Sequence, residues 1–88
     1  MKPLDELTRV TENKIGAGWI YASNMVNLDA VLVPGFLSTR FPDRQMRVAD
    51  KIEVSIFDGD RLAGVADLVV TSVTGKQVAV ARRAEVTL

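Results

Sequence analysis

The sequence predicts a small all-β domain, and three observations lead to this expectation. The last third of the 88-residue chain is dense in Val and Thr, which are enriched in strands. Asp58-Gly59 and Thr74-Gly75 are dipeptides typical of turns between strands. Apolar and polar residues alternate over 52–56, as expected for a strand with one buried face. We therefore expect a small barrel or sandwich of five to six short, mainly antiparallel strands.

The individual elements follow from apolar runs and the turn residues between them. The expected strands are residues 19–22, 30–33, 52–56, 66–73, 77–81 and 85–88. Pro34-Gly35 is expected to end the second strand, and Arg82-Arg83 to interrupt the chain before the last one. A single short helical segment is expected between Arg40 and Val48, after Pro42.

Residues 1–17 are expected to form an N-terminal arm, and residues 18–88 a single β-domain. The arm is polar, with Leu4, Leu7 and Val10 among its few apolar residues. Its Thr and Val residues favour an extended chain, and its glycines oppose a helix. The sequence therefore predicts an extended arm with no more than one helical turn.

Composition narrows the classes of function. Eleven basic and eleven acidic residues cancel, whereas nucleic-acid binding draws most of its affinity from a basic excess. The chain has no Cys and no His, the usual ligands of zinc. No apolar run approaches the ~20 residues that span a bilayer, and the N-terminus lacks the apolar segment of a signal peptide. We expect a protein that is made without export and binds neither nucleic acid nor membrane.

The sequence offers no organised set of catalytic residues. Its Ser and Thr hydroxyls lack a neighbouring His, the base that most often activates such nucleophiles. Asp58-Gly59-Asp60 resembles the start of a calcium loop, but the following residues supply none of the later oxygen ligands. We expect no catalytic site, no metal site and no cofactor, and hence a function that depends on the protein surface.

Four basic residues recur at helical spacing in the middle of the chain. Arg40, Arg44, Arg47 and Lys51 are separated by four, three and four positions, which would align them on one face of a helix. Such a row is either a solvated surface or a docking patch, and the pattern alone leaves both alternatives open.

Several motifs, taken in order, carry a resemblance to a known family. They are Leu7-Thr8-Arg9-Val10, Trp19-Ile20-Tyr21, Val31, Gly35-Phe36-Leu37, residues 47–54 and residues 67–81. In this order the chain resembles small structural proteins of tailed bacteriophages that are encoded near the major capsid protein. Those chains have Gly-Asp before the third strand, where this chain has Ala49-Asp50. If that glycine takes a positive φ, the turn at Ala49 is expected to differ.

The resemblance implies a capsid decoration, or cement, protein located on the virion surface and made in the host cytoplasm. Its partners would be the major capsid protein and neighbouring copies of itself, with the shell stabilised by bridging of capsid subunits. The arm would add a strand to a neighbouring subunit, and arginines would contact acidic shell surface. The expected contact residues are Leu4, Leu7, Val10, Arg40, Arg44 and Arg47.

Two other functions remain open at this point. A head-tail connector or another minor virion component would share the same motifs. A cytoplasmic SH3-like adaptor or nucleic-acid-binding barrel would need an aromatic or basic stripe on its surface, for which Trp19 and Tyr21 are the candidates.

Overall fold

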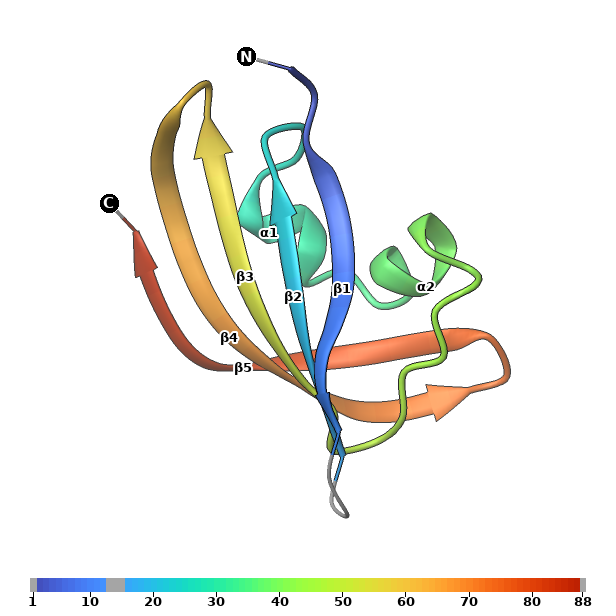
Figure 1. Cartoon of the computed structure of the whole chain (residues 1–88). Coiled ribbons are helices and arrows are strands. Elements are labelled where there is room, and N and C mark those ends of the chain that lie inside the picture. Colours follow the sequence, from blue (N-terminus) through green and yellow to red (C-terminus); the bar gives the residue numbers. More distant parts are fainter. Residues whose placement is uncertain (1, 13–15, 88) are drawn as a thin grey trace.

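The structure is a computed structural model that describes residues 2–12 and 16–87; Met1, residues 13–15 of the expected arm and Leu88 of the expected last strand lie outside it. The described chain forms five strands and two short helices (Figure 1). In order they are β1 (Asp5–Glu12), β2 (Ala17–Ser23), α1 (Leu28–Val31), α2 (Phe36–Arg40), β3 (Lys51–Asp58), β4 (Arg61–Thr74) and β5 (Gln77–Thr87). The predicted all-β class is confirmed.

The strands form one mixed sheet in the order β1-β2-β3-β4-β5. Three of the four neighbouring pairs are antiparallel, and β2 and β3 are parallel. A parallel pair needs a long crossover, which residues 24–50 provide with both helices in it. Figure 1 shows that the end of β4 and the start of β5 run across the direction of the other strands.

Bulges account for much of this bending. The strand register skips one residue at Val10 in β1, at Ala63 and Thr71 in β4, and at Arg83 in β5. Each extra residue bends its strand and increases the local twist. The prediction that Arg82-Arg83 separates two strands is therefore wrong, because β5 continues through a bulge there to Thr87.

Both predictions for the crossover segment are corrected by the structure. Residues 30–33 are not a strand: α1 begins after Asn27, whose side-chain Oδ1 accepts a hydrogen bond from Ala30 N (3.0 Å) and caps the helix. The helix expected after Pro42 lies before it, as α2, which ends at Arg40 with Phe41 as its C-cap residue. Proline disfavours helical geometry in the residue that precedes it, which explains why α2 stops there.

The N-terminal segment is extended, and most of it belongs to the sheet. β1 pairs with β2 from Asp5 opposite Ser23 to Glu12 opposite Ala17. Leu7 lies in the hydrophobic core and is only 2% exposed. Residues 5–12 are therefore a strand of the same sheet rather than an arm that projects from it.

The core lies between the sheet and the crossover segment. Tyr21 from β2 is fully buried and meets the rings of Phe36 and Phe41 edge-on, at centroid distances of 6.3 and 5.7 Å. The buried apolar residues are Leu7, Ala17, Trp19, Tyr21, Val31, Leu37, Met46, Ile52, Val54, Ile56, Ala66, Leu68, Val70 and Val78.

Neither helix of the described residues is long and apolar enough to cross a bilayer.

Candidate functional site

The three apolar residues expected to contact a partner lie in different environments. Leu4 is half-buried beside the end of β2, and Leu7 is part of the core. Val10 is the bulged residue of β1 and is 51% exposed. Of the three, only Val10 presents a largely exposed apolar side chain.

The three arginines do not share a helix face, because the helix ends at Arg40. The Arg40 guanidinium pairs with Asp5 and lies over the Phe36 ring, 5.4 Å from its centroid. Arg44 lies in the loop after α2, and Arg47 lies further along the same loop, with its main-chain N–H bound to Asp50 (2.9 Å). The structure therefore distributes these residues along the margin of the crossover segment.

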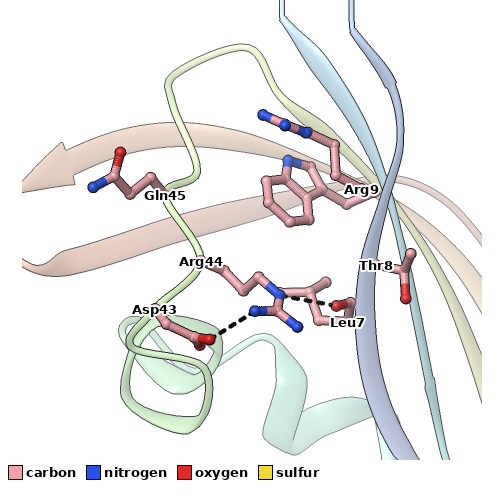
Figure 2. A pocket seen from close by; sticks show the side chains of 7 residues that line it. Leu7, Thr8, Arg9, Asp43, Arg44 and Gln45 are labelled. Carbon is pink, nitrogen blue, oxygen red and sulfur yellow. Dashed lines mark hydrogen bonds and ion pairs between the residues drawn. The ribbon is translucent and has the colours of Figure 1, made fainter.

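Arg44 brings this loop against the edge strand. Its Nε donates a hydrogen bond to the Leu7 carbonyl oxygen (3.2 Å), and its Nη1 pairs with Asp43 (2.7 Å). Figure 2 shows the Arg44 side chain reaching from the loop to β1. Leu7 and Arg44, two of the predicted contact residues, are 37 positions apart in the sequence but are in contact in the fold.

A groove of about 470 Å³ opens between β1 and this loop (Figure 2). We call it the β1 groove and define it by its lining residues: Leu7, Thr8, Arg9, Trp19, Asp43, Arg44 and Gln45. Two guanidinium groups and one carboxylate line it, so its ionisable side chains carry a net positive charge. Leu7 and Trp19 also line it, but their side chains are buried, at 2% and 4% exposed.

The outer edge of β1 borders the same groove. Asn24 N donates to the Leu4 carbonyl (3.0 Å), so the main chain of Leu4 faces β2. Main-chain groups alternate between the two edges of an antiparallel strand, which directs those of Asp5, Leu7 and Arg9 outward. The hydrogen bond from Arg44 to the Leu7 carbonyl agrees with this direction. Among the described residues, no further strand pairs with this edge.

Asp5 anchors the other end of β1. It accepts hydrogen bonds from the Tyr21 hydroxyl and from Arg40 Nε, and so ties β1 to β2 and to the end of α2. Burial raises the pKa of Tyr21, and its bond to Asp5 raises it further, to about 12. Burial also acts to raise the pKa of Asp5, but hydrogen bonds from Tyr21, Arg40 and Ser23 outweigh it and lower that pKa.

Asp50 binds Trp19, one of the residues that line the groove. Its side chain is fully buried and accepts hydrogen bonds from Ala17 N (2.8 Å), Trp19 Nε1 (3.0 Å) and Arg47 N (2.9 Å). The preceding Ala49 has φ 77°, in the left-handed region. Alanine therefore adopts, at this position, a positive φ of the kind considered above for a glycine.

The burial of the aromatic residues bears on the adaptor alternative. Trp19 is 4% exposed and Tyr21 is 0% exposed, and both are occupied by hydrogen bonds to carboxylates. They form no surface stripe. An SH3-like or nucleic-acid-binding function loses the two residues on which it depended.

Sequence reasoning missed the groove because its walls come from residues 7–9 and 43–45. Asp50 had a local signal, since a lone carboxylate directly before a buried strand often caps or ties a turn.

Among residues 2–12 and 16–87, no three His, Cys, Asp or Glu side chains are grouped to hold a metal ion. Comparison of the chain with protein-family models, with curated protein sequences and with solved structures finds no match to any of them.

Proposed function

We propose that this chain is a structural protein that acts by binding other proteins within a repeating assembly, as a capsid decoration protein of a tailed bacteriophage. The observation that carries the proposal is the outer edge of β1 beside the β1 groove. An uncovered strand edge presents main-chain donors and acceptors that a second chain can pair with. The choice of a capsid as the assembly rests on the resemblance of the motifs.

A small surface of this kind suits binding in many copies. Stable one-to-one interfaces bury roughly 800 Å² per partner, whereas the proposed contact surface is one groove and one strand edge. On a lattice, simultaneous contacts with several subunits raise the overall strength of binding without any new contact. The proposed partners are therefore the major capsid protein and neighbouring copies of this chain on the outer surface of the virion.

The basic residues around the groove fit the outer part of such an interface. Arg44 is 42% exposed in its side chain, and Arg47 lies in the same loop. Exposed charges of this kind orient a partner and speed its association more than they strengthen the final complex. They would meet acidic groups on the shell.

The direct test is mass spectrometry of purified particles, combined with co-sedimentation of the isolated chain with empty shells. A decoration protein is expected at a copy number that follows the shell lattice, and it should bind shells that are already assembled. A copy number that follows the single portal vertex would identify a connector instead. Absence of the chain from particles, or failure to bind shells, would overturn the proposal.

A further inference from the structure

We propose that the β1 groove binds an extended segment of a partner protein that carries a carboxylate side chain, with this segment adding to the outer edge of β1. The inference rests on the proposed function only in its choice of a protein partner. It assigns the surface that is used and the chemistry that this surface selects.

The shape of the groove fits an extended chain. Its wall on one side is the edge of β1, and its wall on the other side is the loop that contains residues 43–45 (Figure 2). A volume of about 470 Å³ lies within the range of ligand-binding clefts. A strand added to a sheet lies about 4.8 Å from its neighbour, so the segment would run along β1 between the two walls.

The main chain of β1 supplies the hydrogen bonds. The groups of Leu7 and Arg9 point to the outer edge, by the alternation described above. At present the Leu7 carbonyl accepts a bond from Arg44 Nε at 3.2 Å, which is longer than the usual 2.9 Å of such bonds. An incoming segment can replace this side-chain donor with a main-chain N–H, and this releases the Arg44 guanidinium.

Charge determines which segment is accepted. Once released, Arg44 still lines the groove together with Arg9, and Asp43 is its one acidic lining residue among those that the structure describes. Asp43 and Arg44 are adjacent in sequence and their side chains are 75% and 42% exposed, so their ion pair is weak and readily exchanged. A carboxylate on the segment can accept two parallel hydrogen bonds from a guanidinium. A lysine at the same place would meet like charges.

The experiment uses the full-length chain and two synthetic probes, a six-residue peptide of alternating valine and aspartate and the same peptide with lysine in place of aspartate. Fluorescence of Trp19, the only tryptophan, reports occupancy of the groove. Amide hydrogen exchange reports strand addition. We expect the aspartate peptide to bind, the lysine peptide not to bind, and exchange to slow at Leu7 but not at Thr8, whose amide faces β2.

Two variants separate the groove from general electrostatics. Arg44→Gln should weaken binding of the aspartate peptide about tenfold, because a charge-assisted hydrogen bond is lost. Arg61→Gln removes an equal charge from the start of β4, where the side chain is 81% exposed, and should leave binding unchanged. Equal losses in the two variants would overturn the proposal, as would equal binding of both peptides or no binding of either.

A second copy of the chain is the competing occupant. If sedimentation shows that the free protein is a dimer, and if the Leu7 amide is already protected in it, the groove serves self-association and the proposal is overturned. Failure of the proposed function is distinguishable: absence from particles together with specific peptide binding would leave this inference standing. Incorporation into particles that Arg44→Gln does not alter would contradict this inference alone.

Discussion

At the scale of single residues, Asp50 connects more parts of the chain than any of its neighbours. Its side chain binds the start of β2 and the indole of Trp19, and its carbonyl accepts a hydrogen bond from Val70 N (2.8 Å) in β4. It is fully buried, and of its donor residues Ala17, Trp19 and Val70 are buried while Arg47 is exposed. The crossover segment is thus fixed to the sheet at the residue directly before β3.

Asp50→Ala should therefore be strongly destabilising. The change leaves the N–H groups of Ala17, Trp19 and Arg47 without their acceptor, and a buried donor without a partner costs about 1–3 kcal/mol. We expect a loss of at least about 3 kcal/mol in the free energy of unfolding, measured by urea denaturation. Asp60→Ala, in the exposed β3–β4 turn, is the control and should change stability by less than about 0.5 kcal/mol. A small effect of Asp50→Ala would mean that water replaces the carboxyl group.

The residue before it offers a prediction of the opposite sign. Ala49 has φ 77°, a conformation that costs a residue with a Cβ atom roughly 1–2 kcal/mol relative to glycine. Glycine also makes the unfolded chain more flexible, which offsets part of the gain. Ala49→Gly should raise the free energy of unfolding by about 0.5–1 kcal/mol. If denaturant melts show a loss instead, the alanine methyl makes contacts that outweigh its strained backbone.

The pair of Tyr21 and Asp5 predicts how stability depends on pH. The pKa of Tyr21 is raised to about 12 in the folded protein, from about 10 in an unfolded chain. Above pH 10 the unfolded state loses this proton first, so stability is complete below pH 10 and falls as pH rises toward 12, by up to about 1.4 kcal/mol per pH unit. Absorbance of tyrosinate follows the only tyrosine directly.

Two results would test this dependence. Tyr21→Phe should remove the tyrosinate signal and flatten the loss of stability above pH 10. Ionisation near pH 10 in the native protein would contradict the buried hydrogen bond.

At acid pH, Asp5 affects stability in the opposite direction. Its pKa is lowered in the folded protein, so Asp5 stabilises the fold at pH values above its unfolded-state pKa of about 3.9, and this contribution disappears as pH falls below that value.

At the scale of elements, β1 contributes both to the core and to the groove. Leu7 points into the core and is 2% exposed, while Val10 lies at a bulge and is 51% exposed. Both were expected to anchor a partner, yet only one of them is accessible in the folded chain. The strand therefore contributes to folding through one residue while its outer edge borders the groove.

A comparison of two substitutions tests this division. Leu7→Ala should lower the free energy of unfolding by about 2–4 kcal/mol, since it removes a buried side chain and leaves a cavity. Val10→Ala should change it by less than about 0.5 kcal/mol. Thermal unfolding measured by circular dichroism distinguishes the two. Similar small effects would show that β1 is not held in the sheet as described.

The elements that the sequence predicts correctly share one property. Over 52–56 and 66–70, every second residue faces the core, so the period of two is visible in the sequence. After the bulge at Thr71, residues 72–74 are exposed. Residues 30–33 are apolar throughout, and such a run is compatible with a buried strand or a buried helix; Asn27 as a capping residue decides for the helix. β1 is an edge strand with few buried side chains, so its pairing could not be recognised from its pattern.

The candidate site was less predictable than the fold for a related reason. Arg44 was expected to contribute to a docking surface, but as part of a helical row with Arg40 and Arg47. The actual neighbour of Arg44 is Leu7, and this contact arises from the path of the crossover after α2 ends at Arg40. Such a path depends on tertiary contacts, including those of Asp50, that leave no periodic trace in the sequence.

At the scale of the whole molecule, the sheet joins distant parts of the chain in an order that has β1 and β5 at its two sides. The start of β5 is covered by the α2 region, since Gly35 N donates to the Val78 carbonyl (2.9 Å) and Val78 N donates to Ser38 Oγ (3.2 Å). The outer edge of β1 receives only side-chain cover from the loop, through Arg44. The outer edge of β1 beside the groove is therefore more accessible to a partner chain than the start of β5 is.

Removal of residues 1–12 should therefore abolish the fold rather than release a dispensable arm. The deletion removes β1, including the buried Leu7 and Asp5, which accepts the hydrogen bond of the Tyr21 hydroxyl. The total free energy of unfolding of a domain is only about 5–15 kcal/mol. We expect loss of cooperative thermal unfolding, and recovery when a peptide of residues 1–12 is added. Deletion of residues 1–3, which precede β1 and supply one exposed hydrogen bond through the Lys2 carbonyl, should be tolerated. An unchanged transition in the longer deletion would show that the sheet stands without β1, and capsid binding by that variant would then locate the interface elsewhere.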